Sequence, residues 1–110
     1  MGQVNLADYK NIYLQTAKEY IENLLSSYAK LSANSQDNQA INQIHISSHS
    51  LRSQSQVMGF ENMTNLAADI EKVSDNILNK VSSIDDNFMN LLKRSIDELN
   101  LELSRIEKTQ

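Results

Sequence analysis

The 110-residue sequence contains no cysteine, no proline and no tryptophan, and only two glycines. Without cysteine, no disulfide and no thiolate-ligated zinc or iron–sulfur site can form. Without proline, the chain lacks the residue that most often ends or kinks a helix. Gly59 is the only glycine beyond position 2, which is too few for the turns of a β-rich domain or for a glycine-rich phosphate loop. These absences favour long helices and argue against a self-contained nucleotide-using enzyme.

The chain is also short of positive charge, because ten Lys and Arg residues stand against fourteen Asp and Glu, a formal net charge of -4. An acidic domain is a poor general binder of nucleic acid or of an anionic membrane surface. No apolar run approaches the roughly 20 residues of a membrane helix, and residues 1–7 lack the basic and apolar regions of a signal peptide. We therefore expect a cytoplasmic domain that contacts neither nucleic acid nor a membrane directly.

What the sequence does contain is four amphipathic segments, in which apolar residues recur every three or four positions. They predict helices over about residues 6–31, 37–58, 61–81 and 85–106. Four helices of similar length with short connections favour an all-α fold, an antiparallel up-down four-helix bundle. We expect residues 1–110 to form this single domain, and the isolated domain to be a monomer.

The sequence also predicts which residues form the apolar stripes and which residues end or begin the helices. The stripe on the first helix comprises Tyr9, Tyr13, Ala17, Tyr20, Leu24, Tyr28 and Leu31. The second stripe includes two serines, Ser48 and Ser55, whose small side chains would let a neighbouring helix approach closely. Gly59 is expected to end the second helix as a C′ glycine. Ser83 and Asp86 are expected to form a capping pair at the start of the fourth helix.

The two histidines, His45 and His49, both lie on the second predicted helix. His49 directly follows Ser48 of the stripe, which places it at the edge of the buried face and partly open to solvent. His49 lies ten residues before Gly59, and Glu71 lies twelve residues after it. If the second and third helices pair antiparallel around Gly59, Glu71 and His49 are therefore at similar depth, and Glu71 can reach His49.

This pattern leaves three interpretations open. A histidine at a helix edge is usually a surface residue without a chemical role. His45 and His49 also have the i, i+4 spacing of a helical metal pair, but the HExxH form is absent and a third ligand, such as Glu71, would have to come from a distant segment. In the third interpretation His49 is a functional imidazole that Glu71 supports.

The residues around His49 resemble a known motif. Residues 49–60, HSLRSQSQVMGF, are similar to the phosphoacceptor motif of histidine phosphotransfer (HPt) domains, His-x-Leu-Lys-Gly-x-Ser-x-x-x-Gly. The matching residues are His49, Leu51, Ser55 and Gly59. Beyond the motif, Glu71 and its neighbours resemble the continuation in CheA-type chemotaxis kinases, where a glutamate on the next helix supports the histidine. Residues 9–21 and 88–106 resemble the first and fourth helices of that subfamily.

The resemblance implies a phosphorelay function. His49 would accept a phosphoryl group on Nε2 from the ATP-binding domain of a histidine kinase and donate it to an aspartate of a response-regulator receiver domain. Glu71 would orient His49, and Arg52 would offset the charge of the phosphoryl oxygens. The surface on which partners dock would include Ser53, Gln56 and His45.

The same resemblance implies that the domain needs no cofactor and no metal of its own, because ATP and Mg²⁺ would come with the partner domains. We expect no enzymatic activity from the isolated domain, although it would form part of a histidine protein kinase or act as a free-standing relative.

The sequence departs from the family pattern at three positions, and these departures lead to an alternative function. Arg52 stands where lysine is usual, and it keeps the positive charge and can bind phosphate through two N–H groups. Ser53 replaces a glycine that leaves room for a partner's active site, so we expect reduced transfer. Ala68 stands where CheA-type domains often have a second histidine. The alternative is a degenerate helical adaptor that binds partners without being phosphorylated.

Overall fold

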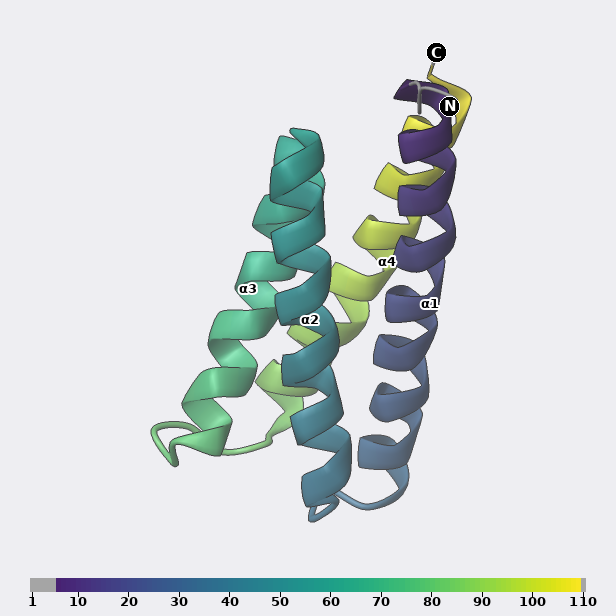
Figure 1. Cartoon of the computed structure of the whole chain (residues 1–110). Helices are drawn as coiled ribbons and strands as arrows, with labels where there is room; N and C mark the ends of the chain where they lie inside the picture. The colour runs from purple at the N-terminus through teal and green to yellow at the C-terminus, as the bar shows by residue number, and fades with distance from the viewer. Residues whose placement is uncertain (1–5, 110) are drawn as a thin grey trace.

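The computed structural model describes residues 6–109. Within that range the chain forms four α-helices and no strand: α1 (Leu6–Ala33), α2 (Asn38–Met58), α3 (Glu61–Leu78) and α4 (Asp86–Lys108). Helices α1 and α3 each pack against α2 and α4. Successive helices run in opposite directions, and the start of α1 lies beside the end of α4 (Figure 1). The predicted antiparallel four-helix bundle is confirmed.

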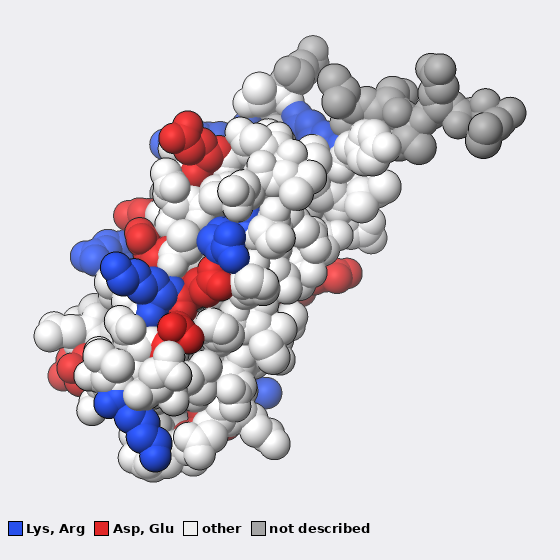
Figure 2. Space-filling model, turned by 60° about the vertical axis from the view of Figure 1, so that its left-hand side comes forward, with Lys and Arg blue, Asp and Glu red and all other residues white. Residues whose placement is uncertain are grey.

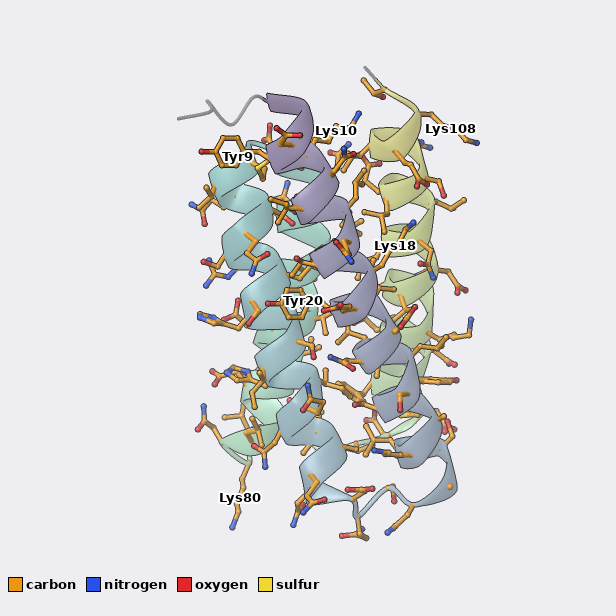
Figure 3. The ribbon with its side chains drawn as sticks, turned by 45° about the vertical axis from the view of Figure 1, so that its right-hand side comes forward. Tyr9, Lys10, Lys18, Tyr20, Lys80 and Lys108 are labelled. Atoms are coloured by element: carbon orange, nitrogen blue, oxygen red, sulfur yellow. The ribbon has the colours of Figure 1, made fainter. Side chains whose placement is uncertain are left out.

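The buried face of α1 differs from the predicted stripe. Tyr9 is 52% exposed, and the buried face includes Leu14 and Ile21 instead. Tyr20 stays at the edge, where its hydroxyl accepts a hydrogen bond from Gln54 of α2 at 3.0 Å (Figure 3). A tyrosine ring can cover the edge of a core while its hydroxyl remains in water. Because the prediction counts tyrosines as core residues, the predicted stripe lies to one side of the face that is buried.

The other stripes lie closer to the prediction. On α4 the six residues of the apolar stripe, which recur every three or four positions, are buried, namely Phe88, Leu92, Ile96, Leu99, Leu103 and Ile106. On α3, Met63 and Ile70 are fully buried, and Ala67 and Ser74 lie on the same face with no exposed surface. Small side chains on α3 allow it to pack closely against α2.

Ser48 and Ser55 of α2 are fully buried, as the stripe predicts. Ser48 donates to the carbonyl of Ile44 in its own helix at 2.7 Å, and Ser55 shares a hydrogen bond of 2.7 Å with the hydroxyl of Tyr13 on α1. Burial raises the pKa of Tyr13 above 10.0, so the hydroxyl stays neutral. Across residues 6–109 no buried side-chain nitrogen or oxygen lacks a partner. The serines therefore permit close helix contact without an unsatisfied polar group.

The corner between α2 and α3 is built on Gly59, as predicted. Gly59 has a φ of 78°, in the left-handed region. Its N–H donates to the carbonyl of Gln56 at 3.1 Å, and the N–H of Phe60 donates to the carbonyl of Ser55 at 3.0 Å. This pair of bonds is a Schellman motif, which ends α2 and turns the chain directly into α3.

Helix α3 ends at Leu78 rather than at residue 81 as predicted. Lys80 takes a φ of 62°, and the N–H of Val81 turns back to the carbonyl of Asn76 at 2.8 Å. This is the same type of helix end as at Gly59, but it uses a lysine in the left-handed position. Because the sequence has no glycine here, the end of the helix could not be recognised from residue type.

Two aspartates cap helices by accepting a backbone N–H three residues further on, at 3.0 Å for Asp37 and 2.9 Å for Asp85. Helices α2 and α4 therefore begin one residue later than predicted. The predicted capping pair of Ser83 and Asp86 is wrong, because the side chain that reaches the first turn of α4 is the carboxylate of Asp85. Helices α1 and α4 each run two residues beyond the predicted ends.

At the end of the bundle where α1 begins and α4 ends, these two helices are held together by side-chain contacts. Lys10 donates to the carbonyl of Thr109, and Lys18 forms an ion pair with Glu107 at 3.3 Å (Figure 3). Both members of the Lys18–Glu107 pair are about half exposed, so we expect this pair to contribute little stability. None of the helices within residues 6–109 combines the length and apolar character that a membrane span requires.

Replacing Gly59 by alanine should destabilise the domain through backbone strain alone. Among the described residues, nothing outside the chain neighbours of Gly59 lies within 4 Å of a Cβ built there. A left-handed φ costs an L-residue about 1 to 2 kcal/mol. We expect Gly59→Ala to lower the free energy of unfolding by that amount in urea denaturation. Gly59→Asn is the matched control and should cost less, because asparagine tolerates this conformation. Equal losses in the two variants would contradict the explanation.

Candidate functional site

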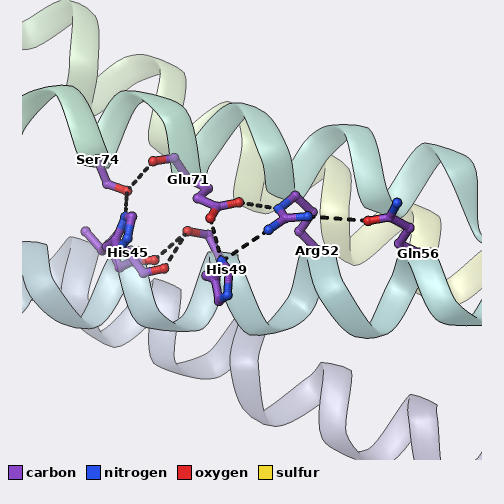
Figure 4. Close-up of polar contacts among 8 residues, drawn as sticks. His45, His49, Arg52, Gln56, Glu71 and Ser74 are labelled. Atoms are coloured by element: carbon purple, nitrogen blue, oxygen red, sulfur yellow. Dashed lines mark hydrogen bonds and ion pairs between the residues drawn. The ribbon is translucent and has the colours of Figure 1, made fainter.

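His49 lies near the middle of α2, on the side that faces α3 (Figure 4). Its side chain is 55% exposed, whereas the preceding residue, Ser48, is fully buried. Successive residues on a helix are about 100° apart, so the residue after a buried position emerges at the edge of the contact. The structure therefore places His49 at the edge of the buried face, as expected from the stripe.

Glu71 of α3 reaches the ring of His49. Oε2 of Glu71 lies 2.6 Å from Nδ1 of His49, the contact that the register around Gly59 implies. A deprotonated Nδ1 would direct its lone pair at a carboxylate oxygen, so Nδ1 carries the proton and donates it to Glu71. When the ring is neutral, this tautomer has its lone pair on Nε2. Within residues 6–109 the polar contacts of the ring involve only Nδ1, which leaves Nε2 open.

Arg52 binds the second oxygen of the same carboxylate. Its Nε donates to Oε1 of Glu71, and its Nη1 lies 3.4 Å from the amide oxygen of Gln56. Its Nη2 lies 3.2 Å from Nδ1 of His49. Nδ1 already donates its proton to Glu71 and so cannot accept a hydrogen bond from Arg52. Arg52 therefore places positive charge beside the ring without forming a hydrogen bond to it. The carboxylate of Glu71 thus fixes the side chains of both His49 and Arg52 on α2.

The charge of Glu71 is maintained by these partners. Its side chain is 18% exposed. Burial raises the pKa of Glu71, but the hydrogen bonds from Arg52 and His49, together with the positive charge of Arg52 and of His49 when it is protonated, lower it more. The pKa of Glu71 therefore lies below its ordinary value of 4.5, and the group is ionised at neutral pH.

His45 lies one turn before His49, and the two rings are nearly parallel, with centroids 6.5 Å apart and 17° between planes. Its Nδ1 is 3.3 Å from the hydroxyl of Ser74, which itself donates to the backbone carbonyl of Glu71 at 2.9 Å. The hydroxyl therefore accepts from His45, whose Nδ1 must carry a proton. Ser74 was not singled out from the sequence. The available signal was its position four residues after Ile70, on the buried stripe of α3.

The two histidines border an open hollow of about 390 Å³ between α2 and α3. Its lining consists of His45, His49, Ala68, Glu71, Lys72 and Asp75. Figure 2 shows a face of the molecule on which basic and acidic side chains alternate rather than gather into a field of one sign. The hollow has the same mixed character, with one lysine and two carboxylates beside the rings.

The two other predicted docking residues lie apart from this hollow. Gln56 is joined to the site only through Arg52. Ser53 is exposed and lines a second hollow, of about 210 Å³, on the α1 side of α2 together with Tyr9 and Val57. The structure thus connects four of the six predicted site residues across α2 and α3, namely His45, His49, Arg52 and Glu71. It leaves Gln56 at the margin and Ser53 outside.

In the described part of the chain, no group of three or more His, Asp or Glu side chains is arranged to hold a metal ion. Nδ1 of both His45 and His49 is bonded to α3, and both oxygens of Glu71 are bonded to α2. The geometry fits a fixed imidazole that presents one open nitrogen.

Two comparisons with known proteins bear on this geometry. Residues 8–108 match the model of the Hpt domain family. Among solved structures, the fold is similar to that of the CheA phosphotransferase domain from Thermotoga maritima, with a TM-score of 0.89. The two chains are 23% identical, and the match covers 96% of this chain and all of the other. At that identity, the likeness between the structures is evidence for a shared four-helix fold.

The depressed pKa of Glu71 makes stability depend on pH. A carboxyl group whose pKa is lower in the folded than in the unfolded chain stabilises the fold above its unfolded pKa, here 4.5, and loses that contribution as the pH falls through its folded pKa. We expect the wild type to lose more stability than Glu71→Gln between about pH 5 and about pH 3. Thermal unfolding across this range measures the difference. Glu22→Gln, an exposed position on α1, is the control and should behave as the wild type. Identical profiles for all three proteins would refute the prediction.

Proposed function

The chain belongs to the Hpt domain family, the histidine phosphotransfer domains, and on this premise we propose that His49 is its phosphoacceptor. The observation that carries the proposal is the state of the ring, which is exposed, has Nδ1 bonded to Glu71 and has Nε2 open. The neutral Nδ1–H tautomer is the nucleophilic form, because its lone pair is on Nε2.

In the first proposed step, the histidine kinase domain of a partner presents ATP together with Mg²⁺, and ATP supplies the phosphoryl group. Nε2 forms a bond to the γ-phosphorus, and the bond between that phosphorus and the oxygen that leaves with ADP breaks. In the second step, an aspartate carboxylate of a response-regulator receiver attacks the phosphorus, the P–Nε2 bond breaks, and His49 returns to its neutral tautomer. The protein's contribution to such transfers is positioning and charge stabilisation.

Glu71 contributes orientation and charge to this proposal. Its bond of 2.6 Å to Nδ1 holds the tautomer in which Nε2 can attack. As the P–Nε2 bond forms, positive charge develops on the ring, and the ionised carboxylate stabilises it. Paired carboxylates orient metal-bound histidines in the same way.

Arg52 contributes positive charge beside the acceptor. Its guanidinium lies against the ring, with Nη2 at 3.2 Å from Nδ1, and its position is fixed by Glu71. A cation held beside the ring would offset part of the negative charge of a phosphoryl group carried on Nε2. We also propose that Ser53 and Gln56, which flank Arg52 on exposed positions of α2, belong to the surface that partners cover.

The acceptor is tested by replacing His49 with glutamine. The domain is incubated with a CheA-type kinase and γ-labelled ATP, and acid-labile, base-stable label is counted. We expect His49→Gln to abolish the label, because glutamine has no nucleophilic ring nitrogen. His45→Gln is the matched control on the same helix, and it should still be labelled. Label that persists in His49→Gln would eliminate His49 as the acceptor and favour the adaptor interpretation.

The role of Glu71 is tested with two variants that separate orientation from charge. Glu71→Gln can still accept from Nδ1 but carries no charge, whereas Glu71→Ala does neither. We expect phosphorylation to slow by about 10- to 100-fold in Glu71→Ala, the usual effect of removing the partner of a functional histidine, and by less in Glu71→Gln. Circular dichroism checks that both remain folded. Wild-type rates in folded Glu71→Ala would contradict the proposed role.

A further inference from the structure

His45 has two features that phosphoryl acceptance at His49 does not use. Its ring is held by the bond between Nδ1 and Ser74 of α3, so it is fixed rather than loose in solvent. It also lies nearly parallel to the ring of His49, at a centroid distance of 6.5 Å. Nδ1 of each ring is engaged with α3 (Figure 4), and both side chains line the same hollow. Two fixed imidazoles therefore border one cavity.

The hollow is suited to an added anion. Its volume of about 390 Å³ leaves room for a phosphoryl group, and Ala68 contributes only a methyl group to its wall. The titratable groups that face His45 come from both helices that line the hollow, and on α2 the group is His49. On α3 they are Glu71, Lys72 and Asp75. Glu71 is already bonded to two donors, which leaves Lys72 and His45 to interact with new negative charge.

We propose that protonated His45 stabilises the phosphoryl group on His49, and is thus a positioning residue of the transfer site. This inference rests on the proposed phosphoacceptor function. The 6.5 Å between ring centroids is longer than a direct hydrogen bond, and it fits a contact from Nε2–H through one bridging water. Unit charges at such a separation in water change a rate or an equilibrium by about threefold.

The proposed effect depends on pH in a defined direction. Imidazole side chains exchange their proton in the range between about pH 5 and about pH 8. An imidazole therefore carries more positive charge near pH 6 than near pH 8.5. In the loose transition state of phosphoryl transfer the phosphoryl oxygens carry less negative charge than in the bound group, so a nearby cation stabilises the bound group more than the transition state. Protonated His45 should accordingly slow the loss of the phosphoryl group.

The test uses the full chain and a small-molecule donor. Phosphoramidate transfers its phosphoryl group to an imidazole as its own P–N bond breaks and ammonia leaves. After removal of the donor, ³¹P NMR follows the loss of phosphohistidine, and peptide mass spectrometry assigns it to His49 rather than to His45. The proteins compared are the wild type, His45→Gln, His45→Lys and Lys108→Gln, which removes an exposed charge at the far end of α4 (Figure 3).

We expect His45→Gln to lose its phosphoryl group about threefold faster than the wild type near pH 6, and at the wild-type rate near pH 8.5. His45→Lys, which keeps a positive charge at both values, should match the wild type near pH 6 and be slower than it near pH 8.5. Lys108→Gln should match the wild type throughout.

Each other outcome has a separate meaning. Equal rates for the wild type and His45→Gln at both pH values overturn the role of His45 and leave His49 as the acceptor. An effect of His45→Gln that is the same at both pH values, or that lysine does not restore, shows that His45 acts through packing and also overturns the inference. If His49 never acquires the phosphoryl group from either phosphoramidate or kinase, the proposed function fails, and the inference fails with it.

Discussion

The carboxylate of Glu71, shared between His49 and Arg52, is the interaction on which the candidate site depends. One oxygen accepts the Nδ1 proton of His49, and the other accepts from Nε of Arg52. Because the hydrogen bonds from two donors and the charge of Arg52 outweigh the effect of burial, the pKa of this carboxyl lies below its ordinary value. A single ionised group thus sets the tautomer of the imidazole, the position of the guanidinium and the local charge.

This interaction exists only because α2 and α3 pack closely and in one register. The left-handed conformation at Gly59 turns the chain in one step, so residues at similar distances from the corner lie opposite each other. Buried small residues on both helices, Ser48 on α2 and Ala67 and Ser74 on α3, keep the helices close enough for side chains of ordinary length to meet. Helices α1 and α4 pack against this pair of helices, which suits a group that, in the proposed function, meets different partners in the same geometry.

The register and the contact between His49 and Glu71 were predictable from the sequence because helical periodicity and a single internal glycine determine them. Other features depend on a competition between the polar and apolar parts of a residue, or between backbone conformations, which residue type alone does not reveal. Tyr9 and Tyr20 match the apolar period of α1, yet their hydroxyls favour the edge of the core. Lys80 ends α3 in a conformation that glycine usually adopts. Ser74 reads as a polar residue, although its hydroxyl is buried between a carbonyl and the ring of His45.

The difference in exposure between the acceptor and its support has a consequence for the proposed chemistry. His49 is 55% exposed, whereas Glu71 is 18% exposed. A partner that approaches Nε2 therefore displaces water from the ring without having to strip water from the carboxylate, which already has its protein donors. In the proposed function, the electrostatic support of the ring is therefore in place before any partner binds. Ser53 lies outside this network, so in the proposed function its effect would be confined to the shape that a partner has to fit.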